Sequence, residues 1–203
     1  MFRFFESIKV DQGRIWHWDL HWNRMQKTVL HHYKAFLDPK PILESLPRIP
    51  SGGKYKMRLR YDKNKFETEL IPYQIRKINR LILIRDNGID YSFKYTDRRT
   101  LNNLVASVGE NEDVIVIKNN AVTDTSYTNL AFYRKGNWYT PAQPLLYGIK
   151  REYLISKGIL KEALISEEAL PSFSKVCLIN AMLDLDELSV PIERVMNKIE
   201  RIH

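Results

Sequence analysis

The chain has 203 residues, of which 44% are hydrophobic and 28% charged, and its formal net charge is +8. This composition is typical of a globular protein that buries a real core in one domain or two small ones. No apolar run reaches the roughly 20 residues of a membrane span, and the N-terminus has no signal-peptide core, so we expect no membrane association. Cys177 is the only cysteine, which excludes an intrachain disulfide and favours the cytoplasm.

The positive charges are scattered in short pairs such as Arg98-Arg99 and Lys150-Arg151. No zinc-finger spacing and no aromatic RNA-binding motif accompanies them, so we expect no nucleic-acid partner. A small anionic ligand accounts equally well for the positive excess. The histidines show no metal-ligand spacing with a nearby acidic residue, and we therefore expect no metal site.

The first part of the chain predicts a sheet with a helix. Apolar residues alternate over residues 2–10 and indicate an opening strand that ends at the turn Asp11-Gln12-Gly13. Asp19 can cap a helix whose apolar stripe has spacings of three or four residues and consists of Trp22, Met25, Val29, Tyr33 and Phe36. Prolines and glycines over residues 39–53 then indicate an irregular connection around a short helix.

A hairpin is predicted next, with strands over residues 55–61 and 66–71 joined by a turn at 62–65. One face of its first strand carries Lys56, Arg58 and Arg60. This face is either simply solvated or, if it faces a ligand, Arg58 and Arg60 could receive substrate carboxylates.

The remaining residues predict further strands and helices. A boundary between two lobes falls near residues 73–77, which divides the chain into a small lobe (1–75) and a larger one (76–203). Strands are expected over residues 80–85, 91–94, 114–117, 129–133, 159–165 and 176–179. Asp97 can cap a helix through Val108, Gly148 precedes a helix that Gly158 ends, and a last helix is expected from Pro191. The fold class is therefore α+β.

Five short stretches occur together in one order along the chain. They are His21-x-x-Arg24-Met25, Lys94 after an apolar-aromatic run, the polar turn Thr123-Asp124-Thr125-Ser126-x-x-Asn129, Gly148-Ile149-Lys150-Arg151, and Leu178-Ile179-Asn180-Ala181-Met182. Together they resemble class IV aminotransferases, the pyridoxal-phosphate enzymes of fold type IV. The resemblance runs from Phe4 to about Asp184 and implies a two-lobed fold like that of D-amino-acid aminotransferase.

The resemblance implies pyridoxal 5'-phosphate as cofactor and a role for each stretch. Lys94 would hold the cofactor covalently and later move the proton on the substrate Cα. Asp124, where the family usually has glutamate, would keep the ring nitrogen protonated; its alternative reading is a plain turn residue. The phosphate would be held by Arg24, by the backbone amides of Ile149 and Lys150, and by the Asn180-Ala181 turn.

The short chain, Asp124 and the Leu-Ile-Asn-Ala-Met stretch look most like small 4-amino-4-deoxychorismate lyases, which release 4-aminobenzoate and pyruvate for folate synthesis. Two alternatives stay open: an aminotransferase for branched-chain or D-amino acids, and a degenerate homologue that acts as a binding protein. Family members are typically homodimers, so the resemblance also implies a homodimer.

Overall fold

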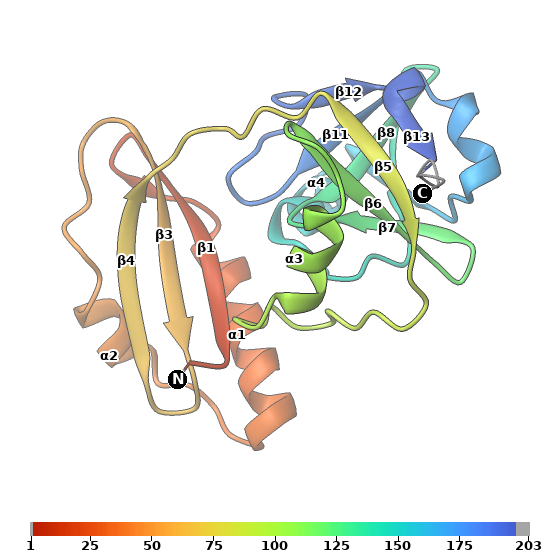
Figure 1. Cartoon of the computed structure of the whole chain (residues 1–203). Helices are drawn as coiled ribbons and strands as arrows, with labels where there is room; N and C mark the ends of the chain where they lie inside the picture. Colours follow the sequence, from red (N-terminus) through yellow and green to blue (C-terminus); the bar gives the residue numbers. More distant parts are fainter. Residues whose placement is uncertain (1, 198–203) are drawn as a thin grey trace. The chain divides into compact units, whose positions relative to one another are not determined.

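The computed structural model describes residues 2–197. The chain divides into two compact units (Figure 1). Of the described residues, the first unit comprises 2–75 together with Phe93–Asp97, and the second comprises Arg76–Ser92 and 98–197. The segment Phe93–Asp97 was predicted in the second lobe, but it belongs to the first unit because its backbone hydrogen-bonds to the start of the first strand.

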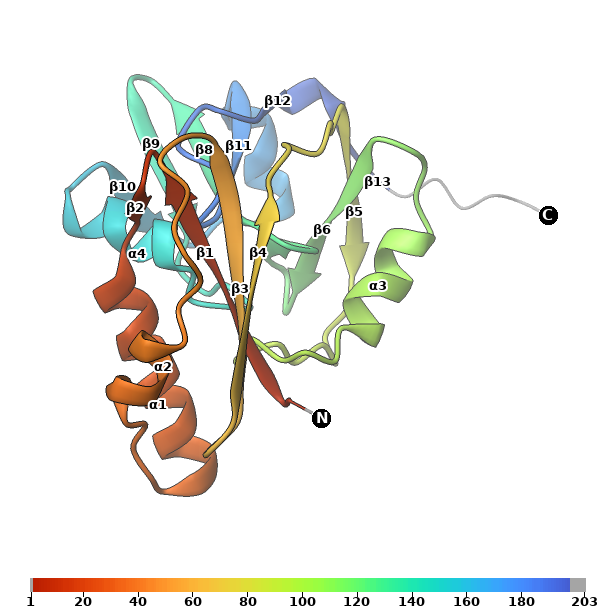
Figure 2. The same cartoon turned by 90° about the vertical axis from the view of Figure 1, so that its left-hand side faces the viewer.

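The first unit is built around an antiparallel sheet with the strand order β2-β1-β3-β4. Its elements are β1 (Phe4–Asp11), β2 (Arg14–Ile15), α1 (Trp18–Tyr33), α2 (Pro39–Glu44), β3 (Lys54–Tyr61) and β4 (Phe66–Pro72). Figure 2 shows α1 and α2 on the same side of this sheet. The opening strand, the short helix after residue 38 and the hairpin predicted from the sequence are confirmed.

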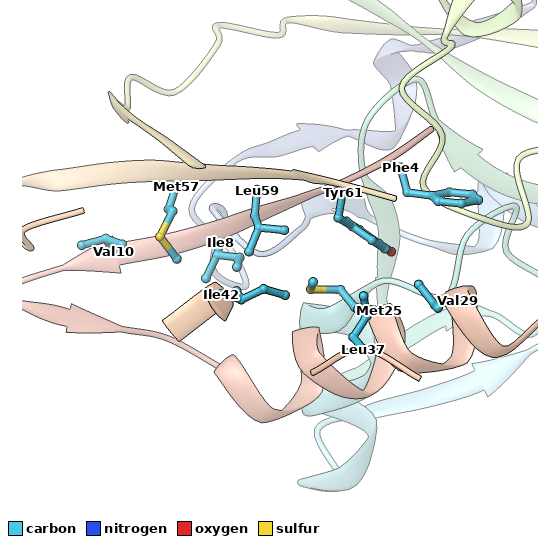
Figure 3. Close-up of a cluster of buried hydrophobic side chains, with 10 residues drawn as sticks. All are labelled: Phe4, Ile8, Val10, Met25, Val29, Leu37, Ile42, Met57, Leu59 and Tyr61. Carbon is cyan, nitrogen blue, oxygen red and sulfur yellow. The ribbon is translucent and has the colours of Figure 1, made fainter. Parts of the chain in front are cut away.

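The core of the first unit lies between the sheet and α1. Ile8 of β1 and Met57 and Leu59 of β3 are fully buried and face Met25 and Val29 of α1 (Figure 3). Full burial of side chains of this size contributes about 1.5–3 kcal/mol each. The alternation of apolar residues along β3 therefore explains why one face of the hairpin packs on the helix.

Two details of the predicted first helix were wrong. The helix begins after His17, which has a left-handed backbone (φ 56°), so Asp19 lies in the first turn and does not cap it. A carboxylate in the first turn still interacts favourably with the helix dipole. Phe36 was predicted to continue the apolar stripe, but the helix ends at Tyr33 and the Phe36 residue is 73% exposed.

The second unit contains two sheets, with the strand orders β13-β5-β6-β7 and β10-β9-β8-β11-β12. Its elements are β5 (Arg80–Arg85), α3 (Arg99–Ala106), β6 (Glu112–Lys118), β7 (Ala121–Thr125), β8 (Asn129–Arg134), β9 (Asn137–Pro141), α4 (Ile149–Ser156), β10 (Leu160–Ala163), η1 (Glu167–Ser172), β11 (Lys175–Ile179), β12 (Ser189–Pro191), η2 (Ile192–Arg194) and β13 (Val195–Asn197). Strands β5 and β6 are parallel, whereas β6–β7 and β8–β9 are antiparallel. This mixture confirms the α+β prediction.

Three predictions for the second half were wrong. Arg98, not Asp97, is the N-cap residue of α3. The predicted helix from Pro191 is a short 3-10 turn followed by β13, whose backbone pairs in parallel with β5. The prediction also placed no strand at residues 121–125, where β7 pairs with β6 through a bulge. Any continuation beyond residue 197 lies outside the described residues. Within residues 2–197, no helix is long and apolar enough to cross a membrane.

Candidate active site

Lys94 belongs to the first unit and lies in a short segment attached to β1. The amide of Phe5 donates to the Lys94 carbonyl (3.0 Å), and the amide of Thr96 donates to the Arg3 carbonyl (2.9 Å). The prediction of a strand here was wrong, because Ser92 hydrogen-bonds to Asp90 and turns the backbone just before this segment. The Lys94 Nζ atom lies 4.8 Å from the centre of the Phe5 ring. The lysine is therefore anchored through its backbone, and an aromatic ring lies beside its amine.

A buried acid–histidine–arginine network lies in the same unit. The side chains of Glu6 and His21 are 0% exposed, and His21 Nδ1 lies 2.7 Å from Glu6 Oε2. Arg24 donates from Nε to Glu6 Oε1 (2.9 Å) and from a terminal nitrogen to Glu6 Oε2. Burial alone would raise the pKa of Glu6, but the charge of Arg24 and the His21 hydrogen bond outweigh it and lower the pKa to about 2. Glu6 is thus a carboxylate that orients Arg24 by a two-pronged ion pair.

His21 is neutral in this network. Burial lowers the pKa of His21, the hydrogen bond to Glu6 opposes that effect, and the charges of Arg24 and Lys94 lower the pKa further. Since Glu6 is ionised, the neutral ring donates from Nδ1, and its Nε2 atom is buried without a hydrogen-bond partner among residues 2–197. The electrostatic effect of Lys94 on His21 shows that Lys94 and Arg24 act on the same part of the first unit.

The two arginines predicted to bind substrate have different surroundings. Arg60 pairs with Glu67 (3.5 Å) and Glu69 (3.2 Å) of the neighbouring strand β4, so its charge is compensated within the sheet. Arg58 lies over the ring of Phe5 at 5.9 Å, and its buried Nε atom has no hydrogen-bond partner in the described part of the chain. Phe5 is therefore contacted by both Arg58 and Lys94. The substrate role of either arginine stays a prediction.

Asp124 lies in the second unit, near the end of β7, and not in the turn where it was predicted. The pairing of Thr125 with Ile115 of β6 extends the strand through this position. The Asp124 residue is 5% exposed. Its Oδ1 atom accepts from the side-chain amide of Asn129 (2.7 Å), and its Oδ2 atom accepts from the backbone amide of Leu146 (2.9 Å). Each carboxylate oxygen is thus held by at least one donor.

Burial raises the pKa of Asp124 to about 7, although hydrogen bonds from Leu146, Asn129 and Leu145 and the charge of Arg151 oppose the rise. Because each carboxylate oxygen can accept more than one hydrogen bond, the group retains capacity for a further donor. A cationic N–H donor next to it would lower the pKa and stabilise the ionised form. The arrangement is therefore suited to a positively charged ligand nitrogen.

The side chain of Asn129 lies so close to Gly148 that it leaves no room for a larger residue there. A Cβ atom at Gly148 would lie 1.9 Å from Asn129 Oδ1, so only glycine fits there. The Asn129 side-chain amide also donates to the Leu146 carbonyl (2.8 Å). Asn129 therefore connects Asp124 to the loop that precedes α4. Helix α4 begins directly after Gly148, at Ile149. Asn129 thereby joins the buried carboxylate to the start of the helix.

The backbone amides of Ile149 and Lys150 lie in the first turn of α4, where amides have no partner within the helix and favour an anion. The side chains of Lys150 and Arg151 make polar contacts within the second unit. Lys150 forms an ion pair with Asp184, and Arg151 donates to the Pro141 carbonyl (2.9 Å) and to Glu162. The side chains of Lys150 and Arg151 thus have partners within the protein, and the phosphate contact of the backbone amides stays a prediction.

Asn180 organises its own turn. Its Oδ1 atom accepts from the amides of Met182 (2.8 Å) and Leu183 (3.0 Å), and its side-chain amide donates to the Tyr127 carbonyl at 3.4 Å. Ala181, the other predicted residue of this turn, is 9% exposed. The turn is therefore joined to the segment that follows Asp124, within the second unit.

The sequence reasoning missed Phe5, Glu6 and the structural role of Asn129. A glutamate within the apolar stretch that became β1 was a detectable signal, since charged residues are seldom buried unless paired. The close contact between Asn129 and Gly148 could not be predicted from the sequence, because the two residues come together only through the tertiary fold.

Known proteins resemble this chain over almost its full length. A sequence model of the amino-transferase class IV family matches residues 92–186. An uncharacterized protein of Haemophilus influenzae is 36% identical over 187 residues, which are 90% of this chain and 98% of that protein. A crystal structure from Haemophilus somnus, described as a candidate 4-amino-4-deoxychorismate lyase, is 31% identical with a TM-score of 0.85, over 91% of this chain and 98% of that one.

The fold is also that of a cofactor-bound structure. A hypothetical aminotransferase from Mycobacterium tuberculosis in its PLP-bound form has a TM-score of 0.73 at 14% identity, over 95% of this chain and 81% of that one. At this identity the likeness shows the fold. The 36% and 31% identical relatives, matched over nearly their whole length, show the family. The chain is a member of the class IV aminotransferase family.

Proposed function

We propose that this enzyme is a pyridoxal-phosphate-dependent lyase that splits 4-amino-4-deoxychorismate into 4-aminobenzoate and pyruvate. The description of the Haemophilus somnus protein supports this substrate, since that protein is 31% identical and its chain is covered to 98%. The proposed setting is the cytoplasm, and the proposed assembly is a homodimer, as is typical of the family.

The observation that carries the cofactor assignment is the buried carboxyl of Asp124. Its pKa is raised to about 7 by burial, and its two oxygens are oriented by Asn129 and Leu146. A protonated pyridine nitrogen supplies the positive N–H donor that such a group lacks. At about 4 Å and an effective dielectric near 20, this pair is worth about 4 kcal/mol. The residues therefore fit pyridoxal phosphate.

Lys94 is the proposed covalent anchor and the proposed base. When bound, pyridoxal phosphate supplies a ring that stabilises negative charge at the substrate Cα. Lys94 would take the proton from that carbon with its amine in the neutral form, and the structure places this amine 4.8 Å from the centre of the Phe5 ring. Anchoring of the Lys94 carbonyl by the Phe5 amide limits the positions that this amine can reach.

Arg24 is the proposed phosphate ligand, together with the amides of Ile149 and Lys150 and the Asn180-Ala181 turn. Glu6 orients the guanidinium of Arg24, and His21 in turn holds Glu6. Glu6 also offsets part of the Arg24 charge, so the backbone amides at the start of α4 are expected to carry a substantial share of the phosphate binding.

An aminotransferase is the second candidate. The matching family model carries that name, and so does the cofactor-bound neighbour of the same fold. The two reactions begin with the same proton transfer and differ in the products. A lyase releases pyruvate and 4-aminobenzoate without an amino acceptor, whereas an aminotransferase needs a 2-oxo acid.

The test is incubation of the purified enzyme with pyridoxal phosphate and aminodeoxychorismate, followed by 4-aminobenzoate fluorescence and pyruvate assay. We expect both products in equal amounts without an added oxo acid. Lys94→Ala should abolish them, and Lys27→Ala, an exposed lysine on α1, should not. Amino-group transfer to a 2-oxo acid without 4-aminobenzoate would refute the lyase and favour the aminotransferase.

A further inference from the structure

Lys94 is the central residue of a tight turn, Phe93-Lys94-Tyr95, which we call the Lys94 turn. The turn is closed by the amide of Tyr95, which donates to the Phe93 carbonyl (2.9 Å). Backbone hydrogen bonds of the Phe5 and Thr96 amides attach the same segment to the residues around the start of β1. Since few backbone bonds hold the Lys94 turn, side-chain packing decides how readily it opens.

His32, in the last turn of α1, packs against the rings on both sides of Lys94. The centre of its imidazole lies 4.5 Å from that of Phe93 and 6.0 Å from that of Tyr95, and each pair of ring planes is inclined at 69°. A third ring, that of Phe4, lies 4.9 Å away. Aromatic pairs at such distances stabilise a structure beyond the area that they bury. His32 therefore joins α1 to both sides of the Lys94 turn.

The aromatic rings and the lysine amine lie on opposite faces of β1. Tyr95 pairs with Phe4 in an antiparallel bridge, so these two side chains share the face that His32 contacts. Phe5 is the next residue of the strand and points to the opposite face, where its ring lies 4.8 Å from the Lys94 Nζ atom. Packing of the rings on the helix side thus holds the turn with its amine on the other side.

The surroundings of His32 favour the neutral imidazole. Its Nε2 atom is buried and has no hydrogen-bond partner within the portion of the chain that the structure describes, residues 2–197. Burial lowers the pKa of His32, and the positive charges of Arg3, His31 and Lys34 lower it further. A proton on His32 is therefore placed in an aromatic cluster and beside other cationic groups.

The other titratable groups next to His32 do not offset such a charge. Tyr33 of α1 and Tyr95 of the Lys94 turn are phenols, with ring centres 6.4 Å and 6.0 Å from the imidazole, and phenols are neutral near pH 7. The Tyr33 hydroxyl donates to Asp62, so this carboxylate already has a partner. Protonation of His32 thus weakens the packing that it provides.

We propose that His32 is a positioning residue for Lys94, whose neutral ring keeps the Lys94 turn closed and whose protonation opens it at acidic pH. This inference rests on the proposed role of Lys94 and adds a residue that acts on it through Phe93 and Tyr95. In the opened turn His32 takes up its proton near the ordinary pKa of 6.5, whereas in the closed turn it does so only at lower pH. Each pH unit between these two values therefore favours opening by up to about tenfold, the limit for one proton.

Hydrogen exchange of the cofactor-free protein, read by NMR between pH 5 and pH 8, tests the proposal. The reporters are the amides of Tyr95 and Thr96, and the amides of the central strand β3 in the same unit are the reference. After correction for intrinsic exchange rates, protection of the reporters relative to β3 should fall at least about threefold from pH 7.5 to pH 5.5. A constant ratio in the wild type would overturn the proposal, and this measurement needs no variant.

Substitutions separate the ring from its charge. His32→Phe keeps an aromatic ring without a titratable group, so the turn should stay protected and lose its pH dependence. His32→Ala should lower protection at pH 7.5 about tenfold, the factor for the loss of one or two aromatic pairs. His31→Phe is the matched control at the adjacent, exposed histidine, whose ring lies 4.7 Å from Phe93. Its pH dependence should persist, and a dependence that is lost there but kept in His32→Phe would overturn the proposal.

The effect on Lys94 itself is measured by borohydride trapping of pyridoxal phosphate at pH 7.5. The label on Lys94, relative to the exposed Lys27, should fall in His32→Ala and return to the wild-type level in His32→Phe. Equal labelling in all three proteins would overturn the positioning role. Label on another lysine of the wild type would remove the proposed anchor and this role with it. A constant exchange ratio in an enzyme that labels Lys94 and releases 4-aminobenzoate would remove only the inference about His32.

Discussion

Glu6 is the residue on which the first half of the candidate site depends. It is a fully buried carboxylate whose two oxygens hold His21 and Arg24. Its lowered pKa means that the ion pair stabilises the folded state above the ordinary value of 4.5, and that this stabilisation is lost as the pH falls towards about 2. The network thus stabilises the first unit while it orients the proposed phosphate ligand.

Glu6→Gln tests this dual role. Glutamine keeps the size of the side chain but leaves Arg24 without its counter-charge, so the free energy of unfolding at pH 7 should fall by about 3 kcal/mol. Urea denaturation at pH 7 and pH 3 should show a smaller difference between the proteins at pH 3. A loss of stability that is the same at both pH values would contradict the ion-pair explanation.

For Asp124 we expect the opposite pH dependence of the folding stability. Its pKa rises from 3.8 to about 7 on folding, so the unfolded chain ionises first and the folded state loses stability as the pH rises through that range. Without cofactor, Asp124→Asn should therefore gain stability relative to the wild type between pH 4 and pH 8, as measured by thermal unfolding. Its turnover should be at least about 100-fold lower. A constant difference in stability across this range would show that Asp124 does not titrate there.

Arg24→Ala separates phosphate binding from structure. We expect the affinity for pyridoxal phosphate to fall by about 1.5–3 kcal/mol, the range for a hydrogen bond to a charged group. Binding of pyridoxal, which has no phosphate, should change far less. An equal loss for both ligands would mean that Arg24 serves only to neutralise Glu6.

At the level of elements, the sequence predicts most strands because their burial follows a simple pattern. Val114–Ile117 are all buried in β6, as their unbroken apolar run indicated. The ends of helices were harder to predict. Asp19 and Asp97 are good capping residues by type, yet His17 and Arg98 occupy the N-cap positions. The segments that precede these helices are hydrogen-bonded to β1 and the residues before it, through Trp16 to Lys9 and Thr96 to Arg3. Helix limits thus depend on tertiary contacts that a local pattern does not contain.

The candidate site could be predicted only in part for the same reason. Lys94, Asp124, Arg24 and the start of α4 were recognisable from their order along the chain. The donors that orient them were not, since Glu6 reaches Arg24 across 18 positions and Leu146 reaches Asp124 across 22. Such partners are set by strand pairing and helix packing, which no short motif encodes.

Gly148→Ala tests the link between β8 and α4. The added Cβ atom would meet Asn129 Oδ1 at 1.9 Å, so Asn129 must move and release both Asp124 and Leu146. We expect a loss of more than about 2 kcal/mol of stability and weaker binding of pyridoxal phosphate. Gly52→Ala, where a Cβ would meet nothing within 4 Å, is the control and should be nearly neutral. A neutral Gly148→Ala would show that Asn129 does not constrain this helix start.

For the whole molecule, each unit is folded around its own part of the proposed chemistry. The first unit supplies Lys94 and Arg24, and the second supplies Asp124 and the start of α4. The proposed assembly of the whole protein is a homodimer, as is typical of the family. Sedimentation of the purified protein at micromolar concentration should give a dimer, and a monomer that retains full activity would contradict that assembly.

The most direct test of the central claim locates the covalent anchor. The protein is incubated with pyridoxal phosphate, reduced with borohydride so that the link to lysine becomes permanent, digested, and mapped by mass spectrometry. The account predicts one dominant label, on the peptide that contains Lys94, and loss of that label in Lys94→Ala. A dominant label on Lys118 or Lys150 of the wild type, or no stoichiometric label at all, would contradict it.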